Sequence, residues 1–299
     1  MDQPEPLLVR DRASGQLVPE RVFGGGALRF LYGTPQGLLL TRLLAARRPF
    51  SVLYGLAQRG RLSRRRVGAF AEALGIDASE AEKPLGEYRS LDEFFARRLR
   101  AGARPIDPHP DHLVSPADGR ALAWQALPAR LTIKDSQVGL RELVGEAALA
   151  DELAGGPALL VRLAPADYHR FHFPAAGVAG RPRVLPGGLH SVHPIALAAG
   201  APSLLNRRAV TRLESDRFGP LLLIEVGAMI VGTIEHTYFP GRVEKGAEKG
   251  TFHFGGSTVL VLARAGRVVW DEDLLASTAE GLETLVRMGT RVGRRGEAG

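Results

Sequence analysis

Short continuous apolar runs, separated by glycine and proline, dominate the chain after residue 113. Three of these runs span residues 159–163, 221–226 and 259–263. Runs of five or six mostly apolar residues between turn residues are typical of buried strands and are short for core helices. We therefore expect a mainly antiparallel β body in this part of the chain.

Before residue 109, apolar residues recur at helical spacing. One helix is predicted over residues 63–74, and a capping box of Ser90 and Glu93 marks the start of a second. The apolar positions of these helices are Val67, Phe70, Ala71 and Leu74 in the first, and Leu91, Phe94, Phe95 and Leu99 in the second. Pro105 ends the helical region. A last helix is predicted over residues 274–288, followed by a frayed basic tail over residues 291–299.

Residues 27–66 combine apolar clusters with many arginines. The residues are Leu38, Leu39, Leu40, Leu43, Leu44, Phe50, Leu53, Tyr54 and Leu56, with Arg42, Arg47, Arg48, Arg59, Arg61, Arg64, Arg65 and Arg66. Two interpretations stay open: short amphipathic helices in a membrane interface, or a helical cap on the protein with a solvated basic rim. Gly33, Pro35 and Gly37 interrupt the most apolar stretch, so we predict no membrane-spanning helix.

These patterns predict an α+β fold in which a helical N-terminal membrane-associating part precedes the mainly antiparallel β body. The expected domains are residues 1–108 and residues 109–299. The chain has 299 residues, 45% of them hydrophobic, which is enough for a substantial core.

Charge and composition narrow the function classes. The formal net charge of +7 favours anionic partners, either nucleic acid or an anionic lipid surface. No aromatic stacking platform or nucleic-acid motif supports the first. The chain has no cysteine, which excludes disulfides, thiolate metal sites and cysteine nucleophiles. Residues 1–6 lack the basic and apolar regions of a secretory signal, so none is expected.

The segment around Ser257 is the strongest candidate for chemistry. Gly255 and Gly256 precede this serine and suit a tight turn, because glycine adopts conformations closed to other residues. A serine hydroxyl that attacks the preceding carbonyl can cut its own chain. The attack needs a base for the hydroxyl proton and a carboxylate that orients the base.

Candidate bases and a candidate carboxylate occur elsewhere in the chain. The free pKa of a histidine side chain lies close to neutral pH, which makes His169 and His172 candidate bases, and Asp118 lies in a Pro-Ala-Asp-Gly turn. Residues three apart on a strand point to opposite faces, so an extended segment would present only one histidine to Ser257. Each pattern also has a structural interpretation, as an ordinary turn or as a structural pair of histidines.

In this order and at these separations, the motifs resemble the prokaryotic, pyruvoyl-dependent phosphatidylserine decarboxylase proenzyme family. The resemblance covers residues 85–265. Its motifs are Ser90 to Phe95 with Arg97, Arg98 and Leu99, Arg104 to Ile106, Ser115 to Gly119, Asp167 to His172 with Pro174, Pro186 to Val192, Asn206 to Val210, Val226 to Gly232, and Lys245, Gly246, Glu248, Gly250, Phe252 and Phe254 to Ser257. The family's usual Leu-Gly-Ser is Gly255-Gly256-Ser257 in this chain, which keeps the Gly-Ser bond.

The resemblance implies that Asp118, His172 and Ser257 form a self-cleavage triad with His172 as the base. Cleavage between Gly256 and Ser257 would give a large chain of residues 1–256 and a small chain of residues 257–299. Ser257 would become a covalent pyruvoyl group. His169 would return a proton to the product, although a structural hydrogen bond is an equal alternative for this residue. No metal is predicted.

The implied enzyme is a carboxy-lyase that converts phosphatidylserine to phosphatidylethanolamine through a Schiff base. It would act as a peripheral protein at the cytoplasmic face of the cell membrane, where the basic residues would meet an anionic surface. Its two chains would stay associated, and a homodimer is left open.

Other functions are consistent with parts of the sequence. A pyruvoyl decarboxylase of a soluble amino acid would use the same chemistry. Residues 241–246 resemble the turn of biotinyl or lipoyl carrier domains, which would stay uncut. Nucleic-acid binding rests on the positive charge alone.

Overall fold

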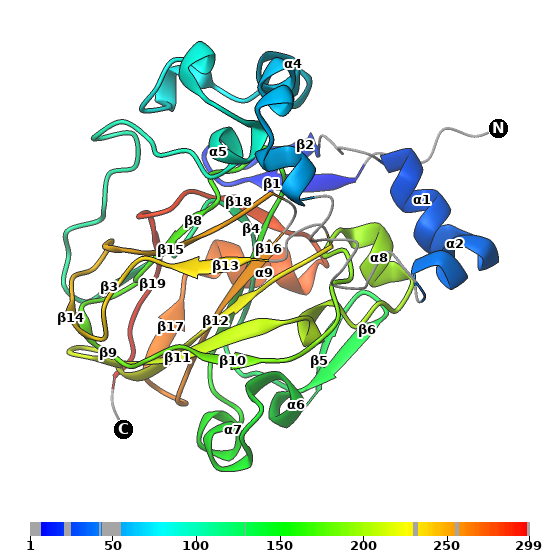
Figure 1. Cartoon of the computed structure of the whole chain (residues 1–299). Coiled ribbons are helices and arrows are strands. Elements are labelled where there is room, and N and C mark those ends of the chain that lie inside the picture. The colour runs from blue at the N-terminus through cyan, green and yellow to red at the C-terminus, as the bar shows by residue number, and fades with distance from the viewer. Residues whose placement is uncertain are drawn as a thin grey trace.

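A large, mostly antiparallel sheet forms the centre of the molecule (Figure 1). The computed structural model describes residues 7–20, 25–41, 43, 55–128, 130–229, 233–254 and 257–297. In sheet order, the strands are β14 (Gly241–Val243), β9 (Gly177–Ala179), β11 (Arg208–Ser215), β12 (Gly219–Val226), β16 (Ser257–Ala263), β7 (Ala158–Leu163), β4 (Gly119–Trp124), β18 (Thr284–Val286), β1 (Leu8–Asp11) and β2 (Leu17–Pro19), with β10 (Arg183–Leu185) paired to β11. The pair of β1 and β18 is parallel, and the other pairs are antiparallel.

Smaller sheets accompany the large one. Their strands are β13 (Ile234–His236), β15 (Glu248–Phe252) and β8 (Arg170–His172) in one, β17 (Val268–Trp270), β19 (Arg291–Arg295) and β3 (His112–Val114) in another, and β5 (Arg130–Ile133) with β6 (Ser136–Gly139) in the last.

The described helices are short. They are α1 (Gly25–Gly33), α2 (Pro35–Leu40), α4 (Val67–Leu74), α5 (Leu91–Phe95), α6 (Leu140–Val144), α7 (Ala147–Leu153), α8 (Pro194–Ala198) and α9 (Glu272–Ala279). Figure 1 shows α4 and α5 together at one end of the molecule, with α1 and α2 to one side. Within the described residues, no helix has the length and apolar character needed to cross a bilayer.

Both faces of the large sheet are buried, because its central strands carry apolar residues on both sides. On one face, Val161, Val259 and Leu223 pack with Phe171 and Phe252 of the β13–β15–β8 sheet. The other face packs against α6 and α7 through a second apolar cluster. This explains why β7, β12 and β16 have continuous apolar runs instead of alternating patterns.

The predicted fold class is confirmed in its coarse form, an α+β protein with mostly antiparallel sheets. The three apolar runs form β7, β12 and β16. The predicted helix over residues 63–74 is present as a 3-10 turn followed by α4. The helix predicted from Ser90 is shorter than expected, because α5 ends at Phe95.

The prediction of a helical region over residues 1–108 was wrong in part, because this region also contains strands. β1 and β2 extend the large sheet, and Glu20 is buried against Arg120 and Arg162. At the other end, α9 stops at Ala279 instead of continuing to residue 288. Gly281 has a φ of 75°, a left-handed conformation that ends helices, and β18 follows.

The expected frayed tail is also ordered in the described residues. Residues 291–295 form β19, which lies between β17 and β3. Val292 is fully buried in the core, and the hydrogen bonds of β19 to its two neighbouring strands hold this basic segment in place. The predicted apolar and basic stretch around residues 42–54 lies, apart from Leu43, outside the described residues.

Candidate active site

Ser257 is the first residue of β16, in the middle of the large sheet. It pairs with Leu163 on β7, and its side chain is fully buried. Its Oγ has no hydrogen-bond partner among the described residues. Gly255 and Gly256 lie outside the described residues. Gly256 is the residue whose carbonyl belongs to the predicted scissile bond.

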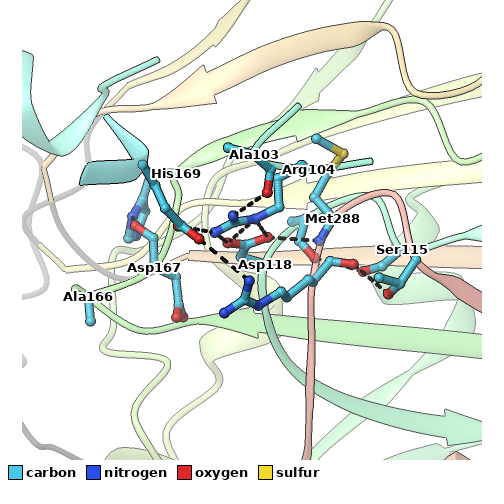
Figure 2. Close-up of polar contacts among 12 residues, drawn as sticks. Ala103, Arg104, Ser115, Asp118, Ala166, Asp167, His169 and Met288 are labelled. Carbon is cyan, nitrogen blue, oxygen red and sulfur yellow. Dashed lines mark hydrogen bonds and ion pairs between the residues drawn. The ribbon is translucent and has the colours of Figure 1, made fainter. Parts of the chain in front are cut away.

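Asp118 immediately precedes β4 and is held by several donors (Figure 2). Arg104 Nε lies 2.9 Å from both carboxylate oxygens, and its Nη2 lies 2.6 Å from Oδ2. The Met288 amide donates to Oδ1 at 2.8 Å. Burial raises the pKa of Asp118 even though Arg104 and the Met288 amide oppose the rise.

The sheet register fixes how far Asp118 lies from Ser257. Arg120 pairs with Arg162, so continuing the register by one residue brings Gly119 beside Leu163, which in turn pairs with Ser257. Neighbouring strands are about 4.8 Å apart, so the start of β4 lies roughly 10 Å from Ser257. The topology therefore brings the predicted carboxylate to the strand end where the serine lies, although not into contact with it.

His172 lies against the turn that contains Asp118. Its backbone amide donates to the Pro116 carbonyl at 2.7 Å, and its side chain is buried on β8. Within the described part of the chain, its buried Nδ1 has no hydrogen-bond partner. Burial lowers the pKa of His172 to about 4, so the ring is neutral at pH 7. A neutral imidazole can accept a proton, as a general base must.

His169 is oriented by a backbone carbonyl. Its Nδ1 lies 2.9 Å from the Asp167 backbone oxygen, which can only accept, so Nδ1 carries a proton and Nε2 is the ring nitrogen that can exchange one. Arg97 Nη2 donates to the same oxygen at 3.3 Å. The His169 carbonyl accepts from the Phe252 amide at 2.9 Å, which ties this turn to the strand that leads to Ser257.

A cavity of about 670 Å³ adjoins the carboxylate. Its lining includes Arg97, Arg104, Asp118, Asp167 and Tyr168. Figure 2 shows the Asp118–Arg104 pair beside the turn of Asp167 and His169. Of the predicted site residues, Asp118 lines this cavity, and Ser257, His169 and His172 do not.

A buried charged cluster near Ser257 was missed at the level of sequence. Lys249 Nζ donates to Glu225 Oε2 at 2.7 Å, and His236 Nε2 lies 3.1 Å from the same oxygen. Glu225 pairs with Val259 across the sheet, so Ser257 is its diagonal neighbour on the same face. Burial tends to raise the pKa of Glu225, but Lys249 and His236 outweigh it, so the pKa is lowered.

The signal for this cluster was present but weak. Glu225 interrupts an otherwise apolar strand of residues 221–226, and a charge inside a buried run needs a partner. Only the tertiary structure shows that the partner is Lys249, because the two residues come from different sheets.

Comparison with known proteins decides the family. The family model described as phosphatidylserine decarboxylase matches residues 91–294. The chain belongs to the phosphatidylserine decarboxylase family. The predicted resemblance is thereby confirmed, and the family model spans Asp118, His169, His172 and Ser257.

Curated relatives match almost the whole chain. A protein of Ruminiclostridium cellulolyticum is 42% identical over 292 residues, which are 96% of this chain and 97% of the relative. A protein of Chlamydia trachomatis is 40% identical, and one of Fusobacterium nucleatum is 37% identical, each over 97% of this chain and over 97% and 98% of the relative. All three are named phosphatidylserine decarboxylase proenzyme. Membership of this decarboxylase family argues against the carrier and nucleic-acid alternatives.

Proposed function

We propose that this chain is a proenzyme that cuts itself between Gly256 and Ser257 and then decarboxylates phosphatidylserine to phosphatidylethanolamine. The observation that carries the proposal is the buried Ser257 at the head of a central strand, in a chain of this family. In this proposal, residues 109–299 form the catalytic domain of the protein, and residues 1–108 form its N-terminal region.

Self-cleavage would proceed through the serine oxygen. Ser257 Oγ loses its proton to His172 and attacks the Gly256 carbonyl, and collapse of the adduct moves the acyl group from nitrogen to oxygen. β-Elimination of the resulting ester then breaks the Ser257 Cβ–O bond and frees the Gly256 carboxylate. The dehydroalanine that remains takes up water and releases ammonia, which leaves a pyruvoyl group on the small chain.

His172 and Asp118 have distinct roles in this proposal. His172 is neutral at pH 7 because burial lowers its pKa to about 4, so it is ready to accept the proton. Asp118, on the turn whose Pro116 carbonyl binds the His172 amide, would stabilise the imidazolium that forms. Arg104 holds Asp118 in place through three hydrogen bonds.

The position of Ser257 fits a pyruvoyl group. Its Oγ has no hydrogen bond among the described residues, so loss of the hydroxyl, which leaves Cβ as the methyl group beside a ketone at Cα, would break no described hydrogen bond of that oxygen. Such a group supplies an electron sink for the loss of a carboxylate as carbon dioxide. His169, oriented by the Asp167 carbonyl, would hold the proton that the product carbon receives.

The two chains would stay associated after cleavage. β16 lies between β12 and β7, β18 lies between β4 and β1, and β19 pairs with β3. Strands of the small chain are thus hydrogen-bonded to the large chain on several sides. A homodimer stays a prediction.

The N-terminal region would hold the enzyme at an anionic membrane surface, as a peripheral protein of the cytoplasmic face. Large exposed apolar side chains concentrate in this region: Phe30, Leu39, Leu40, Leu43, Leu56 and Leu62. Exposed arginines follow at positions 59, 61, 64, 65 and 66. Each basic residue near an anionic surface contributes about 1 kcal/mol, so this combination favours a lipid substrate over a soluble amino acid.

Site variants test the assignment of roles. His172→Ala and Asp118→Asn should leave the precursor uncut, whereas His169→Ala should give two chains that release no carbon dioxide from phosphatidylserine. The measurements are a denaturing gel and release of labelled carbon dioxide. Normal cleavage in both His172→Ala and Asp118→Asn would contradict the proposed triad.

A further inference from the structure

The segment just before the cleavage site carries a histidine between two carboxylates. His253 Nδ1 lies 2.9 Å from Asp92 Oδ2, and its Nε2 lies 2.8 Å from Glu235 Oε2. Ionised carboxylates can only accept, so the two contacts suit a cationic ring that donates from both nitrogens. Its hydrogen bond to Asp92, with further help from Glu235, raises the pKa of His253.

Asp92 binds the backbone of this segment as well as the histidine. It lies in the first turn of α5, is only 6% exposed, and accepts from the Phe254 amide through Oδ1 at 2.9 Å. Arg59 Nε lies 3.2 Å from Oδ2, from a side chain that is 45% exposed. Burial would raise the pKa of Asp92, but His253, the Phe254 amide and Arg59 outweigh it and lower the pKa.

Ring packing holds the same segment against the helical layer. The Phe254 ring lies 5.0 Å from Phe95 of α5 and 5.8 Å from Phe70 of α4, measured between ring centres. Phe95 in turn contacts the ring of His169 at 3.8 Å. Residues 253–254 are therefore fixed by two side-chain ion pairs, a backbone hydrogen bond and aromatic packing, three residues before Ser257.

We propose that Asp92, His253 and Glu235, named the His253 bridge, position the preceding segment so that Ser257 can attack its own peptide bond. The inference rests on the proposed self-cleavage. Asp92 and His253 are positioning residues in it, because neither touches the reacting atoms. A tightly placed segment matters because self-cleavage requires one side-chain oxygen to approach one carbonyl at a defined angle.

The bridge should act on maturation and not on turnover. Before cleavage, residues 253–254 and Ser257 belong to one continuous chain, so fixing the first constrains the second. After cleavage, the bridge belongs to the large chain and residue 257 to the small chain. Loss of the bridge should thus slow precursor processing while each mature active site turns over at a near-normal rate.

The bridge should also depend on pH, with a definite sign. Below the raised pKa of His253 the ring is a cation and binds both carboxylates. Above that pKa it has only one proton to donate, and one carboxylate loses its partner. Asp92, Glu235 and Arg59 are the charged groups that face the ring, from α5, β13 and the N-terminal segment. Wild-type maturation should therefore slow as pH rises through the pKa of His253.

Three variants separate this role from simple stability. Asp92→Asn and His253→Gln remove the ionic contacts, and His253→Arg keeps a cation with several donors at every pH tested. The matched control is Glu93→Gln, which removes a charge at the next position of α5, where Glu93 pairs with the half-exposed Lys83. Precursor conversion is followed on denaturing gels from pH 6 to 9, and decarboxylation of phosphatidylserine vesicles is expressed per pyruvoyl group.

We expect Asp92→Asn and His253→Gln to mature about ten- to a hundredfold more slowly, with turnover per pyruvoyl group within about twofold of wild type. His253→Arg should keep its rate at high pH where wild type slows, and Glu93→Gln should match wild type. If Asp92→Asn fails to fold, the comparison of His253→Arg with wild type at high pH still shows whether the His253 bridge controls the rate of maturation.

Two different failures are distinguishable. Identical maturation profiles for wild type, His253→Gln and His253→Arg would overturn the bridge while leaving self-cleavage intact, and so would a parallel loss of turnover per pyruvoyl group. A wild-type precursor that never converts would overturn the proposed function itself.

Discussion

At the scale of single residues, the two histidines of the predicted pair lie in unlike environments. Both were candidates from sequence because their spacing and residue type suit acid–base chemistry. The structure separates them: a backbone carbonyl orients His169, and His172 is buried without a partner for Nδ1 in the described part of the chain. Burial, which no local pattern encodes, is what makes His172 neutral over most of the pH range.

The pKa of His172 gives a prediction for acid conditions. A base must be neutral to accept a proton, and a pKa of about 4 keeps His172 neutral well below pH 6.5. Titration of His172 alone should leave precursor conversion constant from pH 6 down to about pH 5 and halve it near pH 4, and the raised pKa of Asp118 adds a loss on the same acid side. Pulse-labelled precursor followed on gels, with circular dichroism to confirm folding, provides the measurement. A fall to half near pH 6.5 would show an ordinary, exposed histidine as the base.

At the scale of elements, the sequence predicted those parts whose signal is local. The apolar runs of β7, β12 and β16 needed no knowledge of the rest of the chain, because strands buried on both faces are continuously apolar. The short strands β18 and β19 were missed, since three to five residues with mixed polarity are stabilised mainly by their neighbours in the sheet.

The sequence predicted which residues belong to the candidate site, but not how they are arranged in space. Asp118, His169, His172 and Ser257 came from motifs, but their spatial relation depends on the order of β4, β7 and β16 in the sheet. The His253 bridge depends on a contact between α5 and a segment more than a hundred residues away. Contacts of that separation leave no periodic pattern in the sequence.

At the scale of the whole molecule, the described residues expose large apolar side chains in several places. The N-terminal helical region exposes Leu39, Leu43 and Leu62, strands β9 and β10 expose Val178 and Val184, and Leu8, Leu17 and Phe239 are exposed elsewhere. Figure 1 shows α2 on a different side of the molecule from β9 and β10, which both pair with β11. In the described part of the chain, the exposed arginines at positions 59, 61, 64, 65 and 66 belong to the N-terminal region as well.

A membrane-bound enzyme should contact the membrane with the N-terminal helical region and not with the surface of β9 and β10. Leu39→Glu with Leu43→Glu should reduce cosedimentation with phosphatidylserine vesicles at least about tenfold, because buried apolar area is lost and negative charge is added. The control, Val178→Glu with Val184→Glu, should bind like wild type. Equal binding by all three proteins would contradict the membrane proposal for the N-terminal region.

The intact masses of the purified protein show whether the chain has cut itself before Ser257. We predict two chains in equal amounts, one ending at Gly256 and one beginning at position 257 with a blocked residue. Borohydride should add two hydrogens to the small chain and none to the large chain. A single species of full-length mass, unchanged by borohydride and by incubation with phosphatidylserine vesicles, would contradict self-cleavage before Ser257 and the formation of a pyruvoyl group.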